Sequence, residues 1–129
     1  MIAVDTNVLV RLLTEDDRVQ AERAARLFAE NEILIPKTVM LETELVLRHA
    51  YEVDKKEIFI AFQRLMGLAN VNLEDPQAVS AALSWYRDGF DFADALHLFS
   101  SGNAAGFATF DRSLLRKAGR VSTVNLIAP

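Results

Sequence analysis

Short apolar segments alternate with longer amphipathic segments along this chain, and this alternation constrains its fold more than any other feature. Apolar periodicity and turn residues predict strands at residues 2–4, 32–35, 71–73, 108–110 and 124–127. They predict helices at residues 8–13, 17–30, 38–51, 55–69, 76–87, 92–101 and 113–118, the last closed by Gly119. Because parallel strands need a crossover that covers the sheet, this order predicts an α/β fold with a mainly parallel sheet and helices on both faces.

The size and composition of the chain fit one folded domain. With 129 residues, 51% of them hydrophobic, we expect a single domain over residues 1–129. The absence of cysteine excludes a disulfide framework, thiolate metal ligands and a cysteine nucleophile. Apolar stretches such as residues 58–62 are too short to cross a bilayer, and Asp5 interrupts the first apolar run, so we expect a cytoplasmic protein without a membrane segment. The net charge of −4 argues against a protein that coats nucleic acid by charge alone.

Two aspartates directly follow predicted strands, Asp5 after residues 2–4 and Asp111 after residues 108–110. Ligands of parallel sheets bind beyond the carboxyl ends of the strands, so both positions are candidates for a functional site. Each aspartate also precedes a predicted helix and could be its N-cap. Neither residue is therefore diagnostic by itself.

Glu42 lies in an apolar part of the helix predicted at residues 38–51. None of the residues three and four positions away is a cation, so the sequence predicts a carboxylate that turns inward without a local partner. Such a group needs a neutralising pKa shift, an ion pair from elsewhere in the chain or a metal ion. Glu44, by contrast, has Arg48 four residues later, which predicts a structural pair on the surface.

Asp91 and Asp94 stand at the start of the helix predicted at residues 92–101. A capping pattern explains one of these acids better than both. The positive end of the helix dipole could hold Asp94 ionised while it faces a site. His97 lies one turn further, among apolar residues, and is more typical of core packing than of a ligand or a base.

Four of these acids, Asp5, Glu42, Asp94 and Asp111, are expected to meet at one edge of the parallel sheet. Clustered carboxylates repel one another unless a divalent cation joins them. Oxygen ligands without cysteine favour Mg²⁺ or Mn²⁺, and these ions commonly complete their shell with substrate phosphate. The four acids therefore point to metal-dependent phosphodiester chemistry.

Five segments of the chain together resemble PIN-domain nucleases and, more narrowly, VapC-type toxins of bacterial toxin–antitoxin pairs. They occur in the order typical of the family and are DTNVLVR (5–11), IP (35–36), ETELVLR (42–48), DFADALH (91–97) and TFDR (109–112). The resemblance implies a three-layer α/β/α sandwich, Mg²⁺- or Mn²⁺-dependent endonucleolytic cleavage of RNA, and homodimers that a VapB-type antitoxin inhibits.

The resemblance also assigns roles to individual residues. It makes Asp5, Glu42, Asp94 and Asp111 the catalytic residues and metal ligands. Polar residues of the same segments would support them, namely Thr6, Asn7 and Thr109, with Asp91 as an additional acid. Nearby cations could guide the RNA backbone, although surface solvation is more typical of any single one, and they are Arg11, Lys37, Arg48 and Arg112.

Two other functions stay open at this point. A Mg²⁺-binding receiver-type phosphoacceptor domain has a similar size and class, but such domains normally show paired acids after the first strand, where this chain has Thr6 and Asn7. A PIN-like binding module without catalytic activity is the second alternative. The apolar stripe of the helix predicted at residues 55–69 fits either an antitoxin helix or the core of the domain.

Overall fold

The computed structural model describes residues 1–121 and 124–129, and the side chains of residues 1–119 and 124–129. Three strands form a parallel sheet in the order β1 (Ile2–Ala3), β2 (Ile33–Ile35) and β3 (Val71–Leu73). Ile33 of β2 lies opposite Ile2 of β1 and Val71 of β3. The predicted parallel pairing of the first three strands is confirmed.

The helices lie close to their predicted positions, and aspartates begin several of them. Asp17 and Asp75 accept hydrogen bonds from backbone N–H groups in the first turns that follow them, as N-caps do. The helices are α1 (Thr6–Thr14), α2 (Arg18–Glu30), α3 (Lys37–His49), α4 (Lys55–Met66), α5 (Pro76–Arg87), α6 (Phe92–Phe99) and α7 (Arg112–Val121). Among the described residues, no helix is long and apolar enough to span a membrane.

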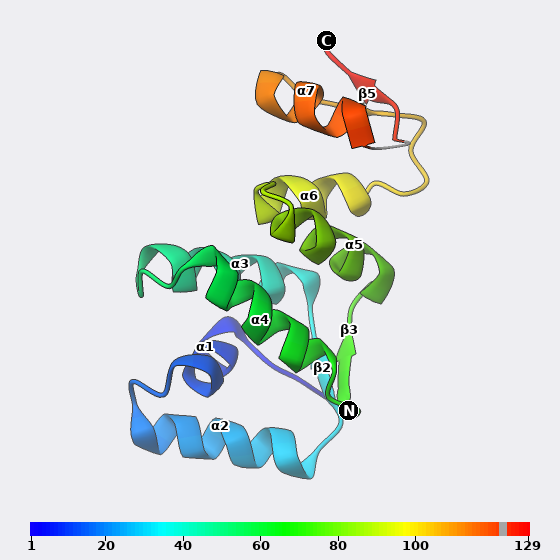
Figure 1. The fold of residues 1–129 in the computed structure, drawn as a ribbon. Coiled ribbons are helices and arrows are strands. Elements are labelled where there is room, and N and C mark those ends of the chain that lie inside the picture. The colour runs from blue at the N-terminus through cyan, green and yellow to red at the C-terminus, as the bar shows by residue number, and fades with distance from the viewer. Residues whose placement is uncertain (122–123) are drawn as a thin grey trace.

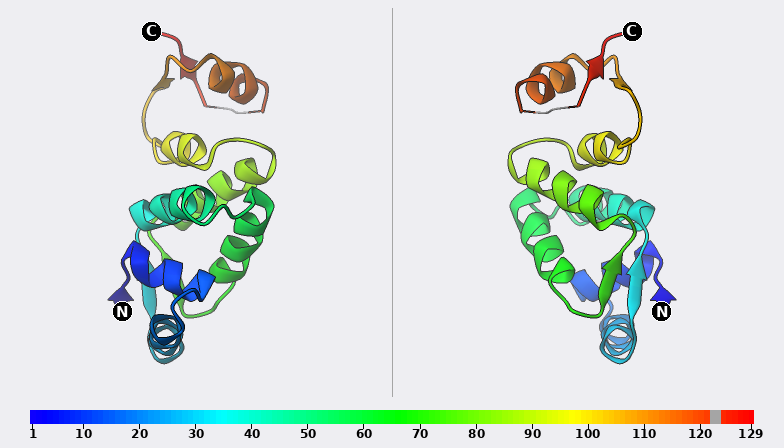
Figure 2. Two further views of the ribbon diagram at one scale, coloured as in Figure 1. Left: turned by 90° about the vertical axis from the view of Figure 1, so that its left-hand side faces the viewer. Right: turned by 90° about the vertical axis from the view of Figure 1, so that its right-hand side faces the viewer.

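The last two strands form a second sheet instead of extending the first. β4 (Phe107–Ala108) and β5 (Leu126–Ile127) pair in parallel with each other. Together with α7 they lie beyond α6, away from the three-stranded sheet (Figures 1 and 2). The expectation that one parallel sheet brings the acids to the same edge is therefore wrong for Asp111, because β4, which precedes it, belongs to the second sheet.

Aromatic side chains form the centre of the main core. Phe62 of α4 and Phe92 of α6 are fully buried, and their rings meet edge to face with centroids 5.7 Å apart. Tyr86 of α5 packs against Phe92 in the same manner at 5.5 Å. Ile58 and Leu65 are buried beside Phe62, so the apolar stripe of α4 belongs to the core and does not offer a groove for a partner helix.

A smaller apolar cluster joins α7 to α6. It contains Phe90, Leu98 and Leu114, with Ala118 fully buried. α7 continues through Gly119 to Val121, so the predicted end of this helix at Gly119 is wrong. A glycine inside a helix costs only about 1 kcal/mol relative to alanine, and the burial of the preceding turns offsets this cost.

Candidate active site

Asp5 begins α1 at the carboxyl end of β1. Its backbone is extended, and its Oδ1 accepts a hydrogen bond of 2.8 Å from the backbone N–H of Thr6. The N-cap interpretation is therefore confirmed. Asp5 is exposed, so the carboxylate that begins α1 is also available to a ligand.

Glu42 lies opposite α1 on the first half of α3. Its Oε1 accepts a hydrogen bond from the hydroxyl of the buried residue Thr6, which ties α3 to the start of α1. Glu42 is exposed, so the prediction that it turns inward without a partner is wrong. Asp5, Thr6 and Glu42 line one pocket of about 330 Å³, together with Asn7 and further residues of α1 and α3.

The other predicted acids gather at the starts of α6 and α7. Asp91 caps α6, with its Oδ2 3.0 Å from the backbone N of Asp94. Asp111 caps α7, with its Oδ1 3.0 Å from the N of Leu114, and its own N–H donates to the Oγ1 of Thr109 at 3.1 Å. As with Asp5, these helix caps follow the predictions made from sequence.

Asp94 is the acid of this second group whose ionisation is perturbed. Desolvation, followed by the negative charges of Asp91 and Asp111, raises the pKa of Asp94 above the usual value for an aspartate. His97 is exposed, so the prediction that it packs in the core is wrong. Its charge acts to lower the pKa of Asp94. The start of α6 therefore carries negative charge that a bound cation would relieve.

The four predicted acids thus form two pairs in this structure. Asp5 and Glu42 line the pocket between α1 and α3, whereas Asp94 and Asp111 lie at the starts of α6 and α7. Within residues 1–121 and 124–129, no three carboxylate or imidazole groups lie close enough together to form a metal cluster by themselves.

Glu44, and not Glu42, is the buried carboxylate of α3. Its side chain is 0% exposed and binds the Nε of Arg48 at 2.7 Å, so the predicted pair exists but is not on the surface. The hydroxyl of Tyr86 donates to the same carboxylate at 2.9 Å, and burial is the main cause that raises the pKa of Tyr86. Arg48 also reaches Asp91 at 3.5 Å, so it bridges the core to the start of α6 and is not available to guide RNA.

Of the cations proposed to guide RNA, Arg11 is the one found in the pocket of Asp5 and Glu42, counting only described residues. Its Nη1 donates to Asp16 at 2.8 Å and to the hydroxyl of Tyr51 at 3.1 Å. Tyr51 also lines this pocket and was not predicted, since it lies 40 residues from Arg11 in the chain and no local pattern marks it.

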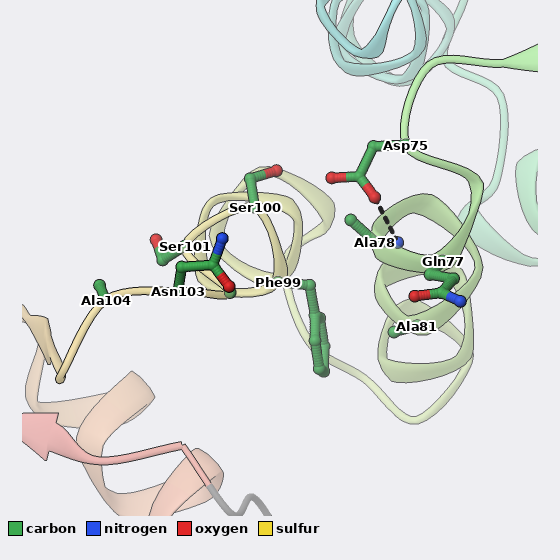
Figure 3. A pocket seen from close by; sticks show the side chains of 10 residues that line it. Asp75, Gln77, Ala78, Ala81, Phe99, Ser100, Ser101, Asn103 and Ala104 are labelled. Carbon is green, nitrogen blue, oxygen red and sulfur yellow. Dashed lines mark hydrogen bonds between the residues drawn. The ribbon is translucent and has the colours of Figure 1, made fainter.

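A second hollow, of about 690 Å³, lies between the start of α5 and the end of α6 (Figure 3). None of the four predicted acids lines it. Asp75 at its edge caps α5 through the N–H of Ala78, drawn in Figure 3, and pairs with the Nζ of Lys37 at 3.3 Å. The Nζ of Lys37 also donates a hydrogen bond to Ser100, which lines this hollow. The polar groups around the hollow therefore pair with one another, and the hollow is separate from the four acids.

Comparison with known families gives a match over nearly the whole chain. The family model described as PIN domain matches residues 2–120. The chain belongs to the PIN-domain family. No curated protein and no solved structure matches it. PIN domains are generally nucleases that bind divalent cations, so the PIN fold of this chain implies hydrolysis of nucleic acid.

The raised pKa of Asp94 predicts how stability depends on pH in this PIN domain. Because the unfolded chain loses the Asp94 proton before the folded chain does, ionisation of Asp94 lowers the free energy of unfolding as pH rises through about 3.9. In EDTA, Asp94→Asn should therefore raise the Tm relative to wild type more at pH 7 than at pH 3. Thermal denaturation across this range checks the prediction.

Asp88→Asn is the control for the Asp94 variant, because it makes the same chemical change at an exposed position. A Tm difference between Asp94→Asn and wild type that does not change with pH would contradict the perturbation of Asp94.

Proposed function

We propose that this PIN-domain protein is a metal-dependent endoribonuclease that acts as the toxin of a VapBC-type toxin–antitoxin pair. Its reaction is the cleavage of RNA phosphodiester bonds with Mg²⁺ or Mn²⁺. The observation that carries the proposal is the pairing of Asp5 with Glu42 in one pocket of a PIN domain. Family membership also argues against the receiver-type alternative, while the retention of all four acids argues against a binding module without activity.

The chemistry of the acids fits a divalent cation. Asp5 and Glu42 offer carboxylate oxygens to one pocket. The pKa of Asp94 is raised first by burial and then by the negative charges of Asp91 and Asp111. Hard ions such as Mg²⁺ and Mn²⁺ prefer oxygen ligands, and they neutralise such groups of acids. We propose that Asp5, Glu42, Asp94 and Asp111 together would hold the ion. Because no three acids of the described residues form a cluster in this structure, the two pairs would have to approach each other when the ion binds. When bound, the ion supplies activation of water and stabilisation of charge on the phosphate.

Neighbouring residues fix the orientation of these acids. The hydroxyl of Thr6 holds the carboxylate of Glu42 toward α1. Asp91 binds the backbone N–H of Asp94 and so fixes the first turn of α6, while Thr109 does the same for the backbone that leads into α7. Asn7 lines the pocket and offers an amide to a bound strand. Positioning of this kind lowers the reorganisation needed during the reaction.

The test of the nuclease assignment is incubation of the purified chain with a labelled single-stranded RNA in Mg²⁺, in Mn²⁺ and in EDTA. Cleavage within the strand in either metal, and none in EDTA, is the expected result. Intact RNA under all three conditions would exclude the endoribonuclease. Sequencing of RNA ends after brief induction in cells would then identify the natural substrate.

The proposed antitoxin follows from the charge of the pocket. The acids Asp5 and Glu42 would attract an arginine or lysine from a partner, because hydrogen bonds between oppositely charged groups are the strong ones. The test is co-expression with any small open reading frame found adjacent to this gene, followed by purification. A common elution peak supports a cognate complex, and separate elution at micromolar concentrations contradicts it.

The proposed homodimer is supported by two exposed apolar side chains, one on the edge strand β1 and one in the loop after β4. In the described part of the chain β1 pairs only with β2, and Ile2 on β1 is 40% exposed. Phe110, directly before Asp111, is 82% exposed. Unpaired edges and exposed aromatic rings of this kind favour association. Light scattering is expected to give twice the chain mass of 14.4 kDa, and a monomer mass at every concentration would contradict the dimer.

A further inference from the structure

A groove between α1 and α2 adjoins the pocket of Asp5 and Glu42. The two helices pack against each other, with α2 seen end-on below α1 in Figure 2, and the groove between them has a volume of about 540 Å³. Asn7 and Arg11 line both the groove and the pocket. A ligand that enters the pocket therefore meets the groove directly, with these two side chains between them.

The charge of the groove is opposite to that of the pocket. Arg11 and Arg23 line the groove and no carboxylate does, whereas the acids Asp5 and Glu42 line the pocket. Arg11 also lines the pocket and is already paired with Asp16 at 2.8 Å, so the positive charge of the groove comes mainly from Arg23. Arg23 is exposed and forms no ion pair with any described residue, so its charge faces the solvent unneutralised. An anion repelled by the acids would be attracted here.

The floor and walls of the groove suit a nucleoside as well as a phosphate. Val8 and Leu27 are half-buried and Ala24 is buried, which gives the groove an apolar floor. The amides of Asn7 and Gln20 add donors and acceptors at its wall. Its volume lies within the range of about 300 to 1,000 Å³ that is typical of small-molecule sites.

Arg11 is held in place before any ligand arrives. Its Nε donates to Gln20 at 2.7 Å, and its Nη1 binds Asp16 at 2.8 Å. Tyr51 bonds to both Arg11 and Asp16, which completes a small network. A guanidinium fixed in this way loses little conformational entropy when it binds a phosphate.

We propose that the groove between α1 and α2 is a nucleotide subsite, which binds the nucleotide of single-stranded RNA next to the bond cleaved in the pocket. Arg23 and Arg11 bind its phosphate, and the apolar floor carries its sugar and base. This inference rests on the proposed nuclease function. A single strand is favoured because its backbone can bend from the acidic pocket into the groove and its base can leave the stack.

The experiment compares Arg23→Ala with Arg18→Ala, which removes the same charge from α2 at an exposed position outside the groove. Anisotropy of a fluorescein-labelled RNA of about twelve nucleotides, in EDTA, gives the Kd at several salt concentrations. Arg23→Ala should raise the Kd by about tenfold and reduce the salt slope by about 0.7, as loss of one phosphate contact predicts. In Mg²⁺ it should raise KM and leave kcat unchanged, and Arg18→Ala should change neither.

The outcomes separate the subsite from the nuclease assignment. If the wild-type protein cleaves RNA but Arg23→Ala and Arg18→Ala behave alike, the groove is not a nucleotide subsite, and a groove that serves a protein partner would give this result. If the wild-type protein fails to cleave RNA in Mg²⁺ and Mn²⁺, the proposed function itself fails. A loss of kcat in Arg23→Ala without a change in the Kd for RNA would also contradict the subsite.

Discussion

Asp5→Asn is expected to lower the rate of RNA cleavage by at least about a hundredfold, because it removes a negative ligand of the proposed cation. The fold should survive the change. Asp5 caps α1 through its Oδ1, and asparagine is an equally good N-cap, so the Tm should stay close to that of the wild-type protein. Initial rates of cleavage of a labelled RNA in Mg²⁺, with thermal denaturation alongside, measure both effects.

Asp88→Asn is the matched control for Asp5→Asn. Asp88 lies on the surface and pairs with Arg87 at 3.4 Å. It does not line the pocket of Asp5 and Glu42, and it is not among the charges that perturb Asp94. The Asp88→Asn variant should cleave RNA at the wild-type rate. Undiminished metal-dependent cleavage by Asp5→Asn, or an equal loss in both variants, would count against the role assigned to Asp5.

Glu44→Ala is expected to lower the free energy of unfolding by about 3 to 5 kcal/mol. The substitution leaves the partly buried guanidinium of Arg48 with only Asp91, at 3.5 Å, and leaves the buried hydroxyl of Tyr86 without its acceptor. A domain of this size has a total stability of about 5 to 15 kcal/mol, so the loss is a large part of it. Denaturant unfolding followed by circular dichroism gives the difference.

Glu22→Ala on the exposed face of α2 is the control for this stability change, and it should stay within about 0.5 kcal/mol of wild type. Tyr86→Phe removes only the hydroxyl that donates to Glu44 and should cost less than Glu44→Ala. A Glu44→Ala variant as stable as Glu22→Ala would show that the buried pair with Arg48 contributes little to the fold.

Local signals in the sequence located the helix starts well. Asp5, Asp91 and Asp111 each precede a helix and each accepts a hydrogen bond from the first turn that follows. A cap depends on residues within three positions of it, so the sequence contains all the information needed. For the same reason, the positions of these three acids at helix starts could be predicted.

The two glutamates of α3 show where local information ends. Apolar residues occur on several sides of this helix, so spacing alone did not identify its buried face. Glu44 is buried because Tyr86, 42 residues away, supplies a hydroxyl beside Arg48. Glu42 is exposed with a partner, Thr6, that lies 36 residues away. Neither partner follows from helical neighbours.

The arrangement of the last strands also depends on distant contacts. β4 and β5 have two residues each, and such short strands carry little pairing information of their own. Phe90 and Leu98 gather α7 and its neighbouring strands into a separate apolar cluster beyond α6. As a result Asp111 lies near Asp94, while Asp5 lies with Glu42 in the other group.

The central claim is that these two groups of acids act on one divalent cation. Titration of the metal-free protein with Mn²⁺ by calorimetry tests it most directly, with Asp5→Asn from one group, Asp94→Asn from the other and Asp88→Asn as control. We expect both site variants to weaken Mn²⁺ binding at least about tenfold and the control to bind as wild type does. Wild-type Mn²⁺ affinity in either Asp5→Asn or Asp94→Asn would contradict the account, because the cation would then not depend on both groups.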